Sequence, residues 1–324
     1  MLGRGVAGHY EAIVESLKDI RGMLGLCPLV ANLESPVCKA QPVSKYGFRA
    51  DPEECRPILK SFDALSVANN HALDCGVEGL RETVSTLREL GIGAVGYRSE
   101  GNPQEPVEYS IDGYAVSLIG LLDSRLLPRA VGTSIATCDD LDIVRCEILR
   151  AREKADYVIC LLHAGDEMVS FPLEHEKVLP RVLLSYGVDV VVRSHAHTLQ
   201  GYERTLNGLV FYGLGDFIFD GRTRRRQISG MVSVVPTETG IEFMPYIVHR
   251  DDDLRPRIAT DWTSGYPQLV VQHQKLRRIL DLIKYYLERT LDILAVHGLV
   301  GVGHIVSKIL VRLRNRLRRL VNLD

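Results

Sequence analysis

The stretch V-D-V-V-V-R-S-H-A-H, residues 188–197, decides the fold class of this chain. Three consecutive valines lie between Asp189 and Arg193, and two histidines separated by one residue follow directly. A short run of β-branched residues is typical of a strand buried on both faces of an α/β sheet. The histidines stand where such a strand ends, at the sheet edge where open α/β folds bind their ligands.

Three other stretches have the same form: L-V-A-N-L-E (29–34), A-L-S-V-A-N-N-H-A-L-D (64–74) and Y-V-I-C-L-L-H-A-G-D-E (157–167). The polar residues of all four stretches are Asn32, Glu34, Asn69, Asn70, His71, Asp74, His163, Asp166, Glu167, His195 and His197. Strand ends of one sheet converge in a crevice, so we expect these side chains to meet. Imidazole, carboxylate and amide oxygen are ligands of divalent metals. The joint occurrence of these four polar clusters predicts a binuclear metal centre.

Each cluster taken alone has an ordinary structural explanation. An H-x-H pair occurs by chance, and His163 could be a core histidine with a satisfied ring. The segment 69–71 could be a turn and a helix cap, and Glu34 could be a surface residue ahead of a proline turn. For the chain as a whole, the alternative to a metal centre is a doubly wound domain whose histidines are incidental. Four clusters with complementary ligand types favour the metal centre over it.

A fifth stretch, G-L-G-D-F-I-F-D at 213–220, follows another apolar run. Its glycines permit a close approach of the backbone, and Asp216 stands at the expected rim of the site. Asp216 could orient a histidine that binds metal, or it could have a packing role only.

The composition narrows the class of protein. The chain has 324 residues, is 46% hydrophobic and has a formal net charge of −2, which does not indicate nucleic-acid binding. Its seven cysteines are scattered without a C-x-x-C motif, a pattern typical of buried thiols in a reducing compartment. No apolar stretch approaches the ~20 residues of a membrane span, and no signal peptide is visible. We therefore expect a cytoplasmic enzyme.

Strand and helix patterns alternate along residues 1–250, which predicts an α/β domain with a mixed central sheet flanked by helices. Helices are expected at 10–24, 53–60, 76–90, 139–154 and 174–186. Asp112-Gly113 and Asn207-Gly208 predict two hairpins.

Residues 251–270 have the composition of a linker, and two amphipathic helices are expected within 271–324. The second helix is strongly basic and carries arginines from Arg312 to Arg319. Such a helix can lie on an anionic membrane surface. The alternative is a helix that packs its apolar stripe on the domain and leaves the cationic face in solvent.

The motifs together resemble the bacterial capsule-synthesis CapA (PGA_cap) family, part of the calcineurin-like metallophosphoesterase superfamily and linked to poly-γ-glutamate synthesis. The matching stretches are N-L-E-S-P (32–36), A-N-N-H-A-L-D-C-G (68–76), H-A-G-D-E (163–167), S-H-A-H-T-L-Q-G (194–201) and residues 213–220. The resemblance runs from Met1 to about Val248 and implies a calcineurin-like sandwich.

The resemblance also implies a role for each matching residue. Glu34 would bridge two divalent cations, with Mn, Fe and Zn as candidates. Asn70, His163 and His195 would complete one metal site and His197 would contribute to the other, with His71 as the catalytic acid. Supporting roles around these ligands are expected for a further set of residues: Asn32, Asn69, Asp74, Glu167 and Asp216.

The chain departs from the family pattern at several positions. The family usually has Trp at position 164, Gly at 194 and Ser-Leu-Gly-Asn at 213–216. Family members also open with a strand that ends in Gly-Asp, commonly continued as V-M-L-G-R, whereas this sequence starts M-L-G-R-G-V. We therefore expect the first strand and its metal-binding Asp to be missing. Either the natural protein is longer, which the upstream codons would reveal, or a natural truncation has left a weakened or mononuclear site.

Two functions follow from the resemblance. The first is a metal-dependent hydrolase of phosphate esters or related bonds, acting in capsule or poly-γ-glutamate synthesis. The second is a non-catalytic or weakly active accessory protein that binds an anionic polymer in capsule assembly.

Overall fold

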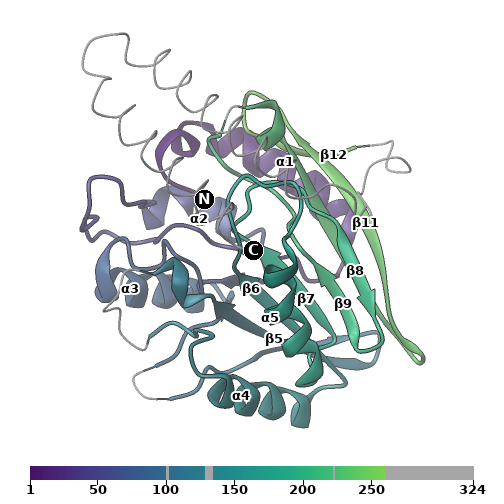
Figure 1. Cartoon of the computed structure of the whole chain (residues 1–324). Coiled ribbons are helices and arrows are strands. Elements are labelled where there is room, and N and C mark those ends of the chain that lie inside the picture. Colours follow the sequence, from purple (N-terminus) through teal and green to yellow (C-terminus); the bar gives the residue numbers. More distant parts are fainter. Residues whose placement is uncertain (100–101, 128–133, 222, 260–324) are drawn as a thin grey trace.

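A six-stranded mixed sheet forms the centre of the molecule (Figure 1). The computed structural model describes residues 1–99, 102–127, 134–221 and 223–259. Four strands of the central sheet are parallel, and an antiparallel strand closes each edge. In spatial order the strands are β4 (Val107–Ile111), β5 (Tyr114–Leu122), β6 (Tyr157–His163), β7 (Val190–Ser194), β9 (Gly208–Phe211) and β8 (Tyr202–Thr205).

Two smaller sheets pack on one face of the central sheet. The first is parallel and contains β1 (Val30–Asn32), β2 (Ala64–Ser66) and β3 (Gly93–Val95). The second is antiparallel and contains β10 (Ile228–Thr237), β11 (Gly240–Arg250) and β12 (Pro256–Ile258). Apolar residues of β5 meet those of β2 and β3, and apolar residues of β7 and β9 meet those of β10 and β11.

Helices cover the outer faces of this double layer of sheets. Helices α4 (Leu141–Lys154) and α5 (Glu174–Ser185) pack on the central sheet through a core that includes Ile148 and Leu183. A second core joins the parallel sheet β1–β2–β3 to the remaining helices, α1 (Tyr10–Leu24), α2 (Pro52–Leu59) and α3 (Gly76–Glu89). Short 3₁₀ segments lie at η1 (Arg4–His9), η2 (Ser124–Leu126) and η3 (Arg224–Gln227). The predicted α/β fold with mixed sheets flanked by helices is confirmed.

Local sequence signals explain the helices and the first hairpin. Ile13, Leu17 and Ile20 recur at helical spacing, and all three are buried on one face of α1. The side chain of Asp140 accepts hydrogen bonds from two backbone N–H groups in the first turn of α4, as an N-cap residue does. Asp112 and Gly113 adopt φ values of 51° and 87° between β4 and β5, which is the backbone that a two-residue hairpin requires.

The domain extends beyond residue 250, where linker-like sequence was expected. β12 pairs with β11, and Leu254 is buried in the core that contains α1. The hydroxyl of Ser16 on α1 donates a hydrogen bond to the carbonyl of Pro256. Residues 251–259 are therefore part of the folded unit. The predicted helices within 271–324, and the linker from residue 260 onward, lie outside the described residues.

An apolar cavity of about 300 Å³ lies beside β1. Among the described strands β1 pairs with β2 alone, and β10 pairs with β11 alone. The cavity is lined by residues of both strands, such as Ala31 and Val232, and by Leu161 of the central sheet. The expected absence of the family's first strand stays a prediction.

None of the helices in the described part of the chain combines the length and the hydrophobicity needed to cross a bilayer.

Candidate metal centre

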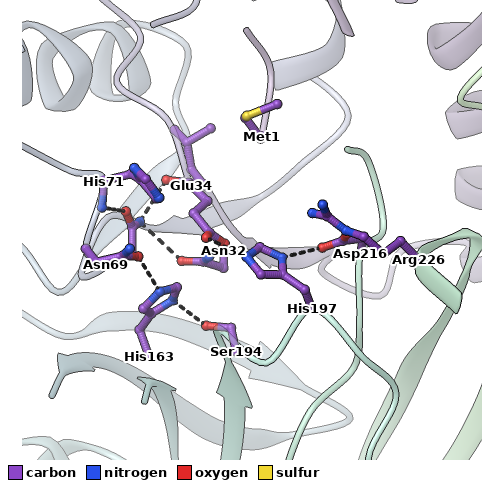
Figure 2. A network of polar contacts seen from close by, with 12 residues as sticks. Met1, Asn32, Glu34, Asn69, His71, His163, Ser194, His197, Asp216 and Arg226 are labelled. Carbon is purple, nitrogen blue, oxygen red and sulfur yellow. Dashed lines mark hydrogen bonds and ion pairs between the residues drawn. The ribbon is translucent and has the colours of Figure 1, made fainter. Parts of the chain in front are cut away.

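Three strand ends bring a carboxylate and two imidazoles together. Glu34 lies two residues beyond β1, His163 is the last residue of β6, and His195 directly follows β7. One ligand atom of each lies within 4.8 Å of the others, and all three side chains are buried. Figure 2 shows Glu34 and His163 approaching the same space from different strands. The clusters that sequence spacing predicted to converge do so.

Glu34 presents a carboxylate oxygen without a hydrogen bond. Its Oε2 accepts a hydrogen bond of 3.1 Å from Asn32 Nδ2, whereas the buried Oε1 has no hydrogen-bond partner. His197 Nε2 lies 3.4 Å from Oε1. A buried carboxylate oxygen that lacks a donor is costly, and a bound cation would compensate for it. These residues therefore fit a divalent metal ion.

His163 is held in a geometry suited to binding a cation. Its Nδ1 lies 2.8 Å from Ser194 Oγ, and its Nε2 lies 2.8 Å from Asn70 Oδ1. Burial and the neighbouring histidines lower the pKa of His163 well below its ordinary value, so the ring is neutral. If Nδ1–H donates to Ser194, then Nε2 and the Asn70 oxygen are two electron-pair donors that face each other. A metal ion can be shared between such a pair.

The two histidines after β7 have an unusual backbone. His195 and His197 have φ values of 94° and 54°, a region that residues other than glycine rarely adopt. This backbone turns both rings toward the cluster. The ring centroid of His195 lies 4.9 Å from that of His163 and 6.2 Å from that of His197.

His197 is tied to a buried carboxylate. Asp216 Oδ1 lies 2.6 Å from His197 Nδ1, and Asp216 Oδ2 accepts a hydrogen bond of 2.7 Å from Arg226 Nε, as Figure 2 shows. Burial alone would lower the pKa of His197, but Asp216 and Glu34 outweigh burial and raise it. Burial alone would raise the pKa of Asp216, but Arg226 and His197 lower it instead. The contact leaves Nε2 of His197 directed at Glu34.

His71 lies beside the cluster in a fixed orientation. Its Nδ1 is 2.8 Å from Asp74 Oδ2, and its backbone N–H donates to Asn69 Oδ1 at 3.1 Å. The ring stacks on Phe48, with centroids 4.0 Å apart, and the Phe48 backbone N–H donates to the same Asp74 oxygen at 2.6 Å. Asp74 therefore fixes one nitrogen of His71 and leaves Nε2 as the nitrogen that can exchange a proton.

Of the supporting residues expected from the sequence, Asn69 joins two loops of the site by hydrogen bonds, whereas Glu167 lies in the loop after β6. Asn69 Nδ2 contacts Asn32 Oδ1 at 3.3 Å and the carbonyl oxygen of Leu33 at 2.8 Å, which joins the loops after β1 and β2. Glu167 is half-buried in the loop after β6. Its supporting role stays a prediction.

Sequence reasoning missed Ser194, Phe48 and Arg226. Ser194 appeared only as a departure from a glycine, and Phe48 lies in a loop without a recognisable motif. Arg226 belongs to the basic run R-T-R-R-R at 222–226, a signal that could have suggested a partner for Asp216. Charge alternation between that run and residues 216–220 was the available clue.

Comparison with known proteins adds the family. A family model described as bacterial capsule synthesis protein PGA_cap matches residues 28–221, which include every candidate metal ligand. The chain belongs to this family. The expectation drawn from the five motifs is confirmed.

Two curated relatives carry related descriptions. The chain is 26% identical over 266 residues to the capsule biosynthesis protein CapA of Bacillus anthracis, covering 75% of this chain and 64% of that protein. It is 28% identical over 238 residues to the PGA biosynthesis protein CapA of Bacillus subtilis (strain 168), covering 68% and 61%. The match thus spans just under two thirds of the length of these relatives.

Solved structures with partial similarity include a hypothetical protein from Thermus thermophilus, with a TM-score of 0.47, 17% identity, and coverage of 74% of this chain and 93% of that one. Vps29 complexed with zinc from Entamoeba histolytica has a TM-score of 0.29 and 13% identity, with coverage of 71% and 97%.

Proposed function

We propose that this member of the PGA_cap family is a metal-dependent hydrolase that cleaves a phosphate ester or a related bond during capsule synthesis. The observation that supports it best is the convergence of Glu34, His163 and His195, whose ligand atoms lie within 4.8 Å of one another. The buried Glu34 Oε1, which has no hydrogen-bond partner, points to a cation as the missing neighbour. Poly-γ-glutamate synthesis, as the wider process, is part of the proposal.

The donor set suits two divalent cations, and Glu34 would contribute to holding both. Asn70, His163 and His195 would hold the first, and His197 Nε2 would hold the second. Imidazole, amide oxygen and carboxylate suit Mn, Fe or Zn. When bound, these ions supply Lewis acidity toward phosphoryl oxygens and lower the pKa of water.

The surrounding residues have separate tasks in this proposal. Ser194 and Asp216 hold the Nδ1 atoms of His163 and His197, which keeps each Nε2 directed at the centre. Asp74 holds Nδ1 of His71, so that Nε2 of His71 can donate a proton to the leaving oxygen. Stacking on Phe48 limits rotation of the His71 ring.

The first prediction tests hydrolysis with p-nitrophenyl phosphate and bis-p-nitrophenyl phosphate. Protein loaded with Mn²⁺ should hydrolyse at least one of them, and chelation should abolish the rate. His195→Ala should reduce activity by more than about 100-fold, because changing an outer partner of a metal ligand already costs 10–100-fold. The matched control is His175→Ala, since His175 is exposed on α5. Full activity of His195→Ala would refute the assignment.

The alternative, an accessory protein that binds an anionic polymer, makes a different prediction in the same experiment. Such a protein would bind polyglutamate with unchanged affinity after chelation and would hydrolyse neither ester. Contact of the C-terminal region with a membrane or a capsule complex remains part of this alternative.

A further inference from the structure

Arg193 is a buried charge in the strand that leads to the two histidines. It lies in β7 between Val192 and Ser194, and only 1% of its surface is exposed. An arginine is rarely buried so completely unless hydrogen bonds satisfy its guanidinium group. The proposed hydrolase chemistry gives this residue no role, so its contacts need a separate explanation.

The guanidinium group reaches three segments of the chain. Nε donates to the carbonyl oxygen of Tyr212 at 2.9 Å, Nη1 donates to that of Glu176 at 3.3 Å, and Nη2 donates to Gln200 Oε1 at 3.0 Å. Tyr212 follows β9, Glu176 belongs to α5 and Gln200 lies in the loop after β7. The planar fork of arginine can make all three contacts at once, which a lysine ammonium cannot do in the same geometry.

Two of these partners, Glu176 and Gln200, connect onward to the loop after His163. Glu176 Oε1 accepts from the backbone N–H of Asp166 at 2.9 Å, and its Oε2 accepts from that of Leu173 at 2.6 Å. Gln200 Nε2 donates to the carbonyl oxygen of Val169 at 2.7 Å. The guanidinium group is thus connected to both ends and the middle of the loop 164–173.

The loop after β6 is also bound directly to the loop after β7. The backbone N–H of Met168 donates to the carbonyl oxygen of Ala196, between the two histidines, at 2.7 Å. Thr198 Oγ1 donates to the Val169 carbonyl oxygen at 2.7 Å. One loop begins at His163 and the other at His195, so these bonds set the relative position of two candidate metal ligands.

The backbone of the loops after β6 and β7 is strained and needs contacts from other segments to keep its conformation. Met168, His195 and His197 all have positive φ, a strained backbone that persists only where the surroundings fix it. Gly165 has a φ of 96°, and a Cβ atom added there would lie 2.8 Å from Arg193 Nη2. The guanidinium group therefore lies directly against the backbone two residues beyond His163.

We propose that Arg193 is a positioning residue that holds His163 and His195 at metal-binding distance by tying together the loops that follow β6 and β7. This inference rests on the proposed role of both histidines as metal ligands. The three bonds of its guanidinium group described above go to protein atoms, so the proposed effect on the metal site is indirect. Its loss should change the geometry and affinity of the metal site and not only the stability of the fold.

The test compares Co²⁺ binding and the visible absorption spectrum of the cobalt-loaded full chain for the wild type, Arg193→Lys and Arg98→Lys. The control Arg98 makes a bidentate contact with the buried Glu147, at 2.9 Å for both bonds, and neither bond involves the loops after β6 and β7. Arg193→Lys should weaken Co²⁺ binding by about 10–100-fold and shift the d–d bands. Arg98→Lys should leave both unchanged even where its Tm falls.

A second variant, Gln200→Met, covers the case in which Arg193→Lys does not fold. It removes the bond from Arg193 to the loop after β7, together with the onward bond from Gln200 to the Val169 carbonyl, but keeps the bonds from Arg193 to the Tyr212 and Glu176 carbonyls. It should weaken Co²⁺ binding in the same direction. A wild-type spectrum and affinity in the folded variants would overturn the inference and leave the proposed function intact. Absence of Co²⁺ binding by the wild type would overturn both.

Discussion

At the scale of single residues, the candidate centre depends on protonation and on fixed ring orientation. Burial keeps His163 neutral, and a neutral ring is the form that binds a metal. Ser194 and Asp216 each contact an Nδ1 atom, so each imidazole has one nitrogen held and one left for the centre. Two predictions test these contacts separately.

The first residue-scale prediction concerns Ser194. Replacing it by alanine removes the partner of His163 Nδ1, so the ring loses its fixed tautomer and orientation. Affinity for Mn²⁺ should fall by about 10-fold, as calorimetric titration can measure. Ser185→Ala is the matched control, because Ser185 is an exposed serine on α5 whose hydroxyl donates to the Val182 carbonyl of the same helix. Equal affinities of the two variants would contradict this account.

The second concerns Asp216, whose pKa is below its ordinary value of 3.8 in the folded chain. The folded state therefore binds the proton less readily than the unfolded chain does. Its carboxylate stabilises the fold above about pH 4, and this contribution is lost as the pH falls further. Asp216→Asn should lower the free energy of unfolding at pH 7 by about 3–5 kcal/mol, because Arg226 and His197 lose a buried partner.

Urea unfolding at a series of pH values measures this effect. The variant should also show a weaker loss of stability between pH 5 and pH 3 than the wild type. Asp142→Asn, at an exposed position in the first turn of α4, should change stability little. A wild-type pH dependence in Asp216→Asn would exclude the assigned role.

At the scale of elements, strand ends do most of the positioning, and this was predictable from the sequence. Apolar runs followed by polar clusters identified β1, β2, β6 and β7 and the residues that converge after them. Helical spacing and caps identified α1 and α4. Contacts such as that of Phe48 with His71 could not be predicted, because they join loops whose paths depend on tertiary packing.

The strand β12 likewise depends on tertiary contacts that the local sequence does not indicate. The sequence around it is charged and proline-containing, so local propensity indicated a linker, whereas pairing with β11 makes it a strand. Leu254 precedes it and is 5% exposed. Leu254→Ala should lower the free energy of unfolding by about 2–5 kcal/mol, as for other buried leucines. The control Leu206→Ala, at a fully exposed hairpin tip, should have almost no effect; equal effects would place 251–259 outside the folded unit.

At the scale of the whole molecule, three sheets and two helical layers bring residues from distant parts of the chain to one point. The ligands come from segments as far apart as Glu34 and His197, and the supporting Asp216 lies later still. No local pattern could give the distances between them. The fold alone brings Glu34, His163 and His195 together, and all three lie within the residues that the family model matches.

The central claim is that Glu34, His163 and His195 hold a divalent metal. The most direct test is a crystal structure of the Mn²⁺-soaked protein with anomalous diffraction data collected on both sides of the manganese absorption edge. We predict a strong anomalous peak between the carboxylate of Glu34 and the rings of His163 and His195, with a weaker second peak next to His197. Crystals with full manganese exposure and no peak at this cluster, or with the manganese bound elsewhere, would contradict the account.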